Sequence, residues 1–133
     1  MSRRGRRGPP TLRRRGPSRD PKIKITVVCE GKLTEPGYIY AFARDCGALV
    51  AIDLALETGA GVPLSVVQKA ITLKPKTHRI ADGFDERDEF WAVFDRDEHP
   101  NFSDALHRAK AAGVHVAYSN PCFELWVVLH FQD

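Results

Sequence analysis

Alternating and consecutive apolar positions predict four strands along the chain. Residues 23–29 alternate apolar with polar side chains before ending in three apolar residues, and this pattern favours a strand. Residues 50–57 alternate in the same way, although their alanine and leucine content leaves a helix open. Residues 89–94 are apolar at consecutive positions, which predicts a strand buried on both faces. Residues 114–118 form the fourth predicted strand.

Two segments with helical signals separate the first three predicted strands. Pro36 suits the first turn of a helix that Thr34 would cap, and Tyr38 and Phe42 then share one face of it. A second helix is predicted to open at Pro63 and to stop before the next proline, at position 75. Both predicted helices therefore connect one strand to the next.

Two more helices complete the pattern. Residues 101–112 predict a helix that Gly113 terminates. After the fourth strand, Asn120 suits an N-cap and Pro121 a first helical residue, for a helix that runs through Phe131. This last helix is apolar nearly all round, so it has to be covered. Either a partner covers it or the natural chain is longer, and we expect the domain to be truncated at its C-terminus.

Strand and helix alternate four times, which predicts an α/β fold. We expect a mostly parallel sheet of about four strands with helices on both faces. The 133 residues are enough for one such domain, at 22–133.

Charge separates a basic arm from this domain. The first 20 residues hold eight arginines and one acid, whereas the rest of the chain is mildly acidic. Residues 1–21 are almost free of apolar side chains and contain several Gly and Pro, so we expect a disordered arm. Arginines gain affinity for nucleic acid by releasing its counterions, although a solvated tail would have the same composition. The candidate phosphate contacts are Arg3, Arg4, Arg6, Arg7, Arg13, Arg14 and Arg15.

Cysteine usage and hydropathy limit the protein class further. The three cysteines form no C-x-x-C pair, and the five histidines have no zinc-site spacing with them. An odd number of such cysteines fits a reducing compartment. No apolar run approaches the roughly 20 residues of a membrane span. We therefore expect a cytoplasmic protein without membrane contact.

Acidic residues follow two of the predicted buried strands. Glu30 ends the first strand, and Asp95 and Asp97 end the third at a spacing that points both side chains the same way in extended chain. In open α/β sheets, ligands bind in the crevice beyond the carboxyl ends of the strands. Two carboxylates there suit Mg²⁺ or Mn²⁺, and Glu30 would act as a general acid/base or complete the metal site.

Further candidates lie in the same two loops. Glu35 is a second acid after the first strand, and Lys32 would neutralise a phosphate or the charge that develops during phosphoryl transfer. Gly31 permits a tight turn or a positive φ. His99 would contact a phosphate or orient Asp97. The plain structural alternative is that acids after a strand solvate a loop or cap the next helix.

Several of these motifs carry a resemblance. CEG-x-x-TE at Cys29–Glu35 and FDRD at Phe94–Asp97, in this strand–helix order, resemble a TOPRIM domain, the metal-binding fold of topoisomerases, primases and the overcoming-lysogenization-defect nucleases. More closely, the Arg-rich start, VCEGKLTEPGY, VFDRDEH and the closing YSNPCFELWVVLHF resemble the RloB family, from Lys22 onward. That family is associated with bacterial defence against phage by abortive infection. Its members are typically encoded beside an ATPase partner and are thought to be TOPRIM nucleases.

The resemblance implies roles for individual residues. Glu30 would be the acid/base glutamate, with Asp95 and Asp97 as the metal pair. Glu35 stands five residues after Glu30, whereas nuclease-type TOPRIM loops often place the second acid four residues after the first, so it ranks as a secondary candidate. The closing motif adds two accessory candidates, which are Asn120 and Glu124. Glu124 would supply a further acid near the crevice or serve only the electrostatics of its helix terminus.

Three functions remain open from the sequence. The favoured one is a Mg²⁺- or Mn²⁺-dependent nuclease that acts on DNA or RNA beside an ATPase partner. The second is a non-catalytic TOPRIM-like module that recognises nucleic acid or that partner. The weakest is a receiver-like phosphoacceptor, which would need an acid pair ending the first strand, where Cys29 precedes the single Glu30. The substrate, the trigger and the oligomeric state are not indicated.

Overall fold

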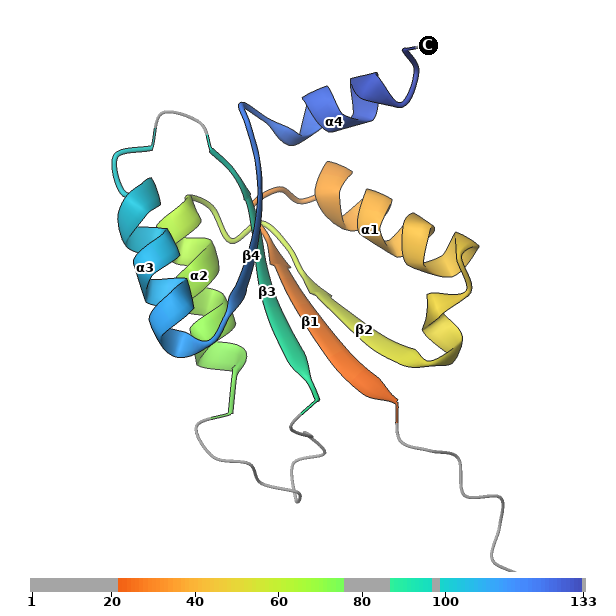
Figure 1. Cartoon of the computed structure of the whole chain (residues 1–133), viewed down its shortest axis with the longest axis horizontal. Helices are drawn as coiled ribbons and strands as arrows, with labels where there is room; N and C mark the ends of the chain where they lie inside the picture. The colour runs from red at the N-terminus through yellow and green to blue at the C-terminus, as the bar shows by residue number, and fades with distance from the viewer. Residues whose placement is uncertain (1–21, 76–86, 97–98, 133) are drawn as a thin grey trace, which may run out of the picture.

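Four parallel strands with helices on both faces form the fold (Figure 1). The computed structural model describes residues 22–75, 87–96 and 99–132. Within them the elements are β1 (Ile23–Cys29), α1 (Thr34–Asp45), the 3₁₀ helix η1 (Ala48–Val50), β2 (Ile52–Glu57), α2 (Pro63–Leu73), β3 (Glu89–Asp95), α3 (Phe102–Ala112), β4 (His115–Ser119) and α4 (Phe123–Leu129). The predicted α/β class is confirmed, and the basic arm lies outside the described residues.

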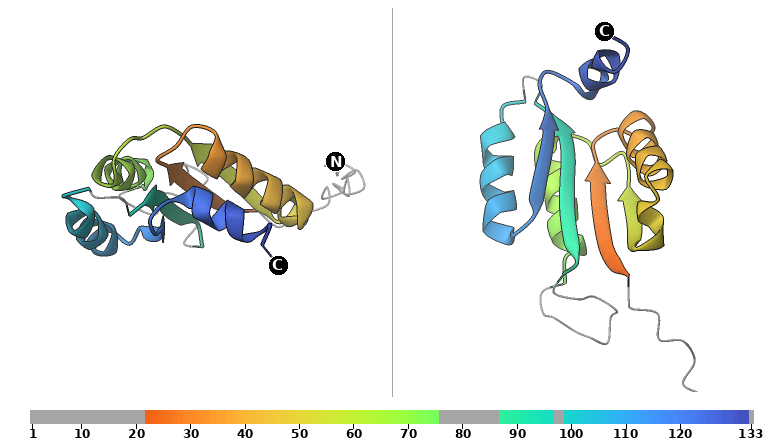
Figure 2. Two further views of the ribbon diagram at one scale, coloured as in Figure 1. Left: turned by 90° about the horizontal axis from the view of Figure 1, so that it is seen from above. Right: turned by 45° about the vertical axis from the view of Figure 1, so that its right-hand side comes forward.

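The strand order β2-β1-β3-β4 decides which helix covers which face. The chain moves from β1 to β2 on one side and then crosses back to β3 on the other side of β1. Because parallel crossovers are right-handed, this reversal places α1 on one face and α2 and α3 on the opposite face (Figure 2). The gap beyond β1 and β3 is therefore the topological switch point, where sheets of this order bind ligands.

The main core lies between the sheet and the pair α2 and α3. Alternate β3 side chains, Phe90, Ala92 and Phe94, point into it and are buried. Ala105 and Ala109 of α3 are fully buried, and such small side chains let the helix lie close to the sheet. The other core members are Val28, Val66, Val67, Ala70 and Val114.

The opposite face of β3 is only half-buried, so the prediction of a strand buried on both faces is wrong. Trp91 and Val93 border an apolar groove of about 380 Å³, which Tyr38 and Phe42 of α1 line from the other side. Phe42 is 62% exposed. A single helix, α1, covers this face beside β1 and β2, whereas two helices cover the other.

Several predicted boundaries shift in the structure. Thr34 is the first residue of α1, and the preceding Leu33 offers no side-chain cap, so the predicted cap at Thr34 is wrong. α4 begins only at Phe123; the Asn120–Pro121 bond is cis and lies before the helix, so neither residue has its predicted capping position. The C-terminal stop at Gly113 is confirmed, because this glycine has a φ of 68°.

α4 packs against α1 beyond the ends of the strands (Figure 1). The Tyr38 ring meets Phe123 edge-on at 5.4 Å between centroids. The Nδ1 of His130 donates to the carbonyl of Trp126, which leaves Nε2 to accept from the Tyr38 hydroxyl at 3.2 Å. Trp126 itself is 49% exposed, so much of this apolar helix faces outward.

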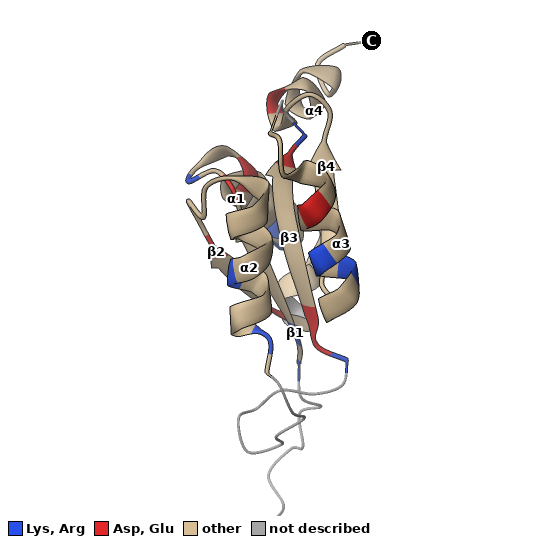
Figure 3. Ribbon diagram, turned by 90° about the vertical axis from the view of Figure 1, so that its left-hand side faces the viewer, with Lys and Arg blue, Asp and Glu red and all other residues tan. Residues whose placement is uncertain are grey.

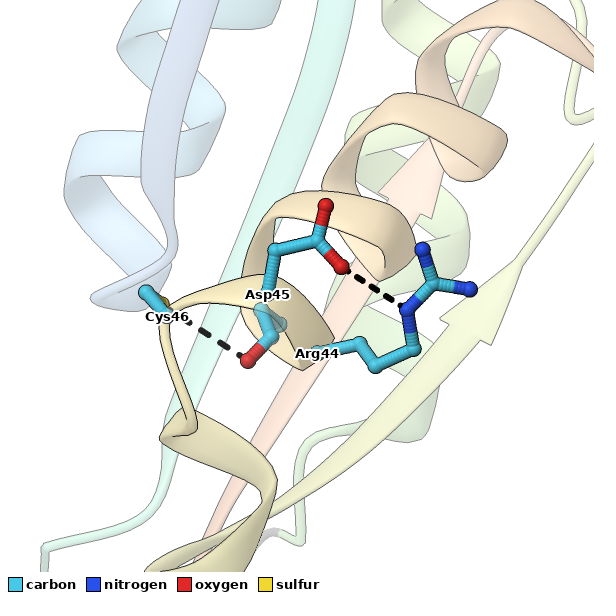
Figure 4. A network of polar contacts seen from close by, with 4 residues as sticks. Arg44, Asp45 and Cys46 are labelled. Atoms are coloured by element: carbon cyan, nitrogen blue, oxygen red, sulfur yellow. Dashed lines mark hydrogen bonds and ion pairs between the residues drawn. The ribbon is translucent and has the colours of Figure 1, made fainter.

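The other end of α1 closes in a local polar network (Figure 4). The Nε of Arg44 donates to the Oδ1 of Asp45 at 2.9 Å, and the Cys46 thiol donates to the carbonyl of Ala43. Both charged side chains are exposed, so their ion pair contributes little to stability. The functional candidates lie at the opposite end of this helix.

Candidate active site at the carboxyl ends of the strands

Two of the predicted carboxylates meet across the switch point. Glu30 follows β1, and its backbone N–H donates to the carbonyl of Val93 at 3.0 Å, at the last pair of β1 with β3. The Oε2 of Glu30 then accepts the backbone N–H of Asp95 at 2.8 Å. The structure thus brings together the acids that end two neighbouring strands, and Figure 3 shows acidic residues at this end of the sheet.

Asp95 also contacts the first residue of α4. Its Oδ1 accepts the backbone N–H of Phe123 at 2.9 Å, in a helix for which the adjacent Cys122 makes no side-chain cap. The pKa of Asp95 is raised to about 6, mainly by burial. The Phe123 N–H opposes the rise, and the charges of Glu30, Glu35 and Glu124 add to it. Asp95 is therefore both a strand-end acid and the capping group of α4.

Glu35, which is only a secondary candidate from the sequence, lies closer to Glu30 and Asp95 than that ranking implies. It is the second residue of α1 and is only 6% exposed, and its negative charge contributes to the raised pKa of Asp95. A Cβ on Gly31 would collide with the Glu35 carboxylate. Gly31 is not among the positive-φ glycines, so the feature that sets this position apart is the close approach of the Glu35 carboxylate and not its φ. Glu30, Glu35 and Asp95 therefore form one set of acidic side chains, and we call these three residues together the carboxylate group.

Cys29 directly precedes Glu30 but offers no nucleophile. Its side chain is fully buried. Burial, with a smaller contribution from the negative charge of Glu35, raises the pKa of the Cys29 thiol to about 11. The thiol stays protonated near neutral pH and serves as a small packing group.

His99 and Glu124 border the carboxylate group. The Nε2 of His99 lies 3.6 Å from the Oε1 of Glu30, the oxygen that does not accept from Asp95. Glu124 is exposed in the first turn of α4 and reaches Asp95 only through its charge. His99 therefore contacts Glu30 directly, whereas Glu124 lies at the edge of the pair.

Lys32 and Asn120 lie to either side of the pair. Lys32 is exposed, and its stem lies beside Gly59, where an added Cβ would meet the Lys32 Cγ at 3.0 Å. This places its stem on the β2 side of Glu30, away from β3. Asn120 follows β4 and lines a polar pocket together with His99. No described contact joins either side chain to Glu30 or Asp95.

Asp97 and the arginines of the arm lie outside the described residues. Within the described part of the chain, no three His, Cys, Asp or Glu side chains are close enough together to hold a metal ion. Glu30, Glu35 and Asp95 nevertheless have the chemistry of hard-cation ligands, since all three offer carboxylate oxygens. Burial and, beside it, the charges of Glu30 and Glu35 raise the pKa of Asp95, and a nearby cation would offset both effects. These residues therefore fit Mg²⁺ or Mn²⁺ in their donor chemistry, though not in the spacing of the described side chains.

Sequence reasoning missed the contact between Asp95 and Phe123. The two residues are 28 positions apart, and the N–H that Asp95 accepts belongs to the backbone, so no residue type announces it. A weak signal existed: α4 begins without a Ser, Thr, Asp or Asn at its N-cap position, and such a helix requires a partner from elsewhere.

The chain belongs to the RloB-like protein family, whose profile matches residues 25–133. The match begins inside β1 and covers every later described strand and helix, and with them Glu30, Glu35 and Asp95. No curated protein and no solved structure is significantly similar to the chain. In the described part, no helix is long and apolar enough to cross a membrane.

Proposed function

We propose that this protein is a metal-dependent nuclease that hydrolyses phosphodiester bonds of nucleic acid in cytoplasmic anti-phage defence. The observation that carries the proposal is the hydrogen-bonded pair of Glu30 and Asp95 at the switch point of the sheet. Membership of the RloB-like family supports the defence role and an ATPase partner, through the resemblance described above.

Each carboxylate has a separate role in this proposal. Asp95 and Asp97 hold Mg²⁺ or Mn²⁺, and Glu35 adds a third negative charge close by. When bound, the ion supplies positive charge against the phosphate and acidifies a coordinated water. Lys32 and the arginine arm contact the backbone of the substrate.

Glu30 is the proton acceptor. One of its oxygens is engaged by the Asp95 amide, which fixes the orientation of the carboxylate. The other oxygen, Oε1, faces His99, and the side chain is 21% exposed, so water reaches it. Glu30 takes a proton from the attacking water as the oxygen of that water bonds to phosphorus and the ester P–O bond breaks. The departing ester oxygen leaves with the bonding electron pair and takes a proton from solvent.

A binding module without catalysis is the second candidate, and one observation favours it. Both carboxylates have structural partners, because Glu30 accepts from Asp95 and Asp95 caps α4. Such a module would recognise nucleic acid or the ATPase partner and would have no need of a metal.

Calorimetry and a cleavage assay together separate the two functions. The nuclease is expected to take up Mg²⁺ or Mn²⁺, to lose that uptake in Asp97→Ala, and to cut labelled single-stranded DNA or RNA only when the metal is present. A protein that binds nucleic acid equally well in EDTA, takes up neither metal and cuts neither substrate is the binding module.

A further inference from the structure

A polar pocket opens directly beside the carboxylate group, between the end of β3 and the start of α3. It has a volume of about 710 Å³, and its polar side chains are Arg96, His99, Ser103 and Asn120. We call it the Arg96 pocket. Its size suits a nucleotide unit, since small-ligand sites span about 300–1,000 Å³.

The basic groups of this pocket are placed to face a ligand. The Arg96 guanidinium lies 5.7 Å from the centroid of the Phe102 ring, and this cation–π contact holds the side chain at the wall. Arg96 takes part in the sheet only through its backbone N–H, which donates to the carbonyl of Ser119 at 2.7 Å. The side chain is exposed, so stacking on the ring leaves its N–H groups accessible.

His99 joins the pocket to the carboxylates. It lines the Arg96 pocket, and its Nε2 lies 3.6 Å from the Oε1 of Glu30. A ligand in the pocket would therefore lie next to the proposed proton acceptor. The pocket and the carboxylate group are two adjoining parts of one surface.

Electrostatics favour a phosphate group in the pocket. A phosphodiester is repelled by the negative charges of Glu30, Asp95 and Glu124. Among the described residues, Arg96 is the basic side chain that lies beside these acids on the β3 side. An arginine fork matches two oxygens of one phosphate, and the hydroxyl of Ser103 and the amide of Asn120 add neutral donors. An anion thus approaches the carboxylates along this wall.

We propose that the Arg96 pocket binds the backbone phosphate that neighbours the scissile one, with Arg96 as its principal contact. This assignment rests on the proposed nuclease function. It makes Arg96 a substrate-positioning residue, whereas the sequence showed it only as the middle position of the Asp-x-Asp motif.

Inorganic phosphate tests the pocket without metal or cleavage. The full chain is titrated with phosphate in EDTA, and the NMR signals of the Ser103 amide and the Asn120 side-chain amide are followed. Arg96→Gln is compared with Arg108→Gln, which removes the same charge from an exposed position on α3 that does not line the pocket. Arg96→Lys keeps the charge and loses the fork.

The expected result is saturable movement of both signals in the wild type and in Arg108→Gln. We expect Arg96→Gln to weaken phosphate binding at least about tenfold and Arg96→Lys to fall in between, as for a charge-assisted hydrogen bond. Equal affinity in Arg96→Gln and Arg108→Gln overturns the assignment. So does a response in which phosphate moves neither pocket signal.

Cleavage assays on the same variants separate this inference from the nuclease proposal. If the wild type cleaves nucleic acid and Arg96→Gln matches it in both phosphate binding and KM, the pocket assignment fails while the nuclease stands. If the wild type cleaves nothing but phosphate still requires Arg96, the pocket stands as an anion site and the nuclease fails.

Discussion

The backbone N–H of Asp95 donates to the Glu30 carboxylate at 2.8 Å, although the two residues are 65 positions apart in the chain. Parallel pairing of Cys29 with Val93 places the two strand ends side by side. The contact therefore follows from strand register, and it orients one candidate catalytic group by means of the backbone of the other.

The capping role of Asp95 is testable through protein stability. Asp95→Asn and Asp95→Ala both remove the charge, but only asparagine keeps an oxygen that can accept the Phe123 N–H. We expect the alanine variant to be less stable than the asparagine variant by about 1 kcal/mol, the usual cost of losing a helix cap. Urea unfolding at pH 7 in EDTA measures the difference. Equal stabilities would show that the contact does not support α4.

The raised pKa of Asp95 predicts a pH dependence of stability. Between the ordinary value of 3.8 and the folded value of about 6, the folded protein keeps a proton that the unfolded chain loses. The free energy of unfolding should therefore fall through this group as pH rises across that window. Urea unfolding of the wild type and Asp95→Asn from pH 4 to pH 7, in EDTA, should show the variant gaining relative stability with pH. A constant difference would contradict the shift.

Two glycines should respond oppositely to alanine. A Cβ at Gly31 meets the Glu35 carboxylate, so Gly31→Ala should destabilise the protein by about 1–3 kcal/mol, as overpacking does. A Cβ at Gly37, inside α1, meets nothing within 4 Å, so Gly37→Ala should stabilise by up to about 1 kcal/mol through helix propensity.

The cost of the collision at Gly31 can be measured separately in a Glu35→Ala background. With the carboxylate removed, Gly31→Ala should cost much less than in the wild type, and this coupling is what a double-mutant cycle reports. The same cost in both backgrounds would mean that Glu35 does not lie against Gly31.

Thiol reactivity should distinguish the cysteines. Cys46 is exposed, whereas Cys29 is buried with its pKa raised to about 11. A disulfide reagent near neutral pH should modify Cys46 quickly and Cys29 only after unfolding, and Cys46→Ser should remove the fast phase. Cys29→Ala should retain metal-dependent cleavage. Loss of cleavage in a folded Cys29→Ala protein would reassign the chemistry to the thiol.

Local sequence signals predicted much of the fold. The strand at 23–29 and the helix starting at Pro63 have the bounds predicted from periodicity and from proline, and Gly113 ends α3 in the left-handed region. The start of α4 was predicted two residues early, because Asn120 and Pro121 have the right residue types for a cap that the chain does not form there.

The candidate site was predictable only in part. Glu30 and Asp95 could be paired because each ends a buried strand and parallel strands share one edge. The burial of Glu35 against Gly31 depends on how α1 leaves the loop, and the contact of Asp95 with Phe123 depends on where α4 packs. Neither of these tertiary contacts leaves a periodic pattern in the sequence.

Cleavage by charge-neutral variants tests the central proposal most directly. Labelled single-stranded DNA and RNA are incubated with Mg²⁺ or Mn²⁺ and the wild type, Glu30→Gln or Asp95→Asn. Glu57→Gln is the control, because Glu57 also ends a strand but lies on β2 near Lys69, outside the carboxylate group. We expect both site variants to lose at least about 100-fold in rate, the scale of general acid–base catalysis, and Glu57→Gln to cleave like the wild type. Wild-type rates in both Glu30→Gln and Asp95→Asn would contradict the proposal.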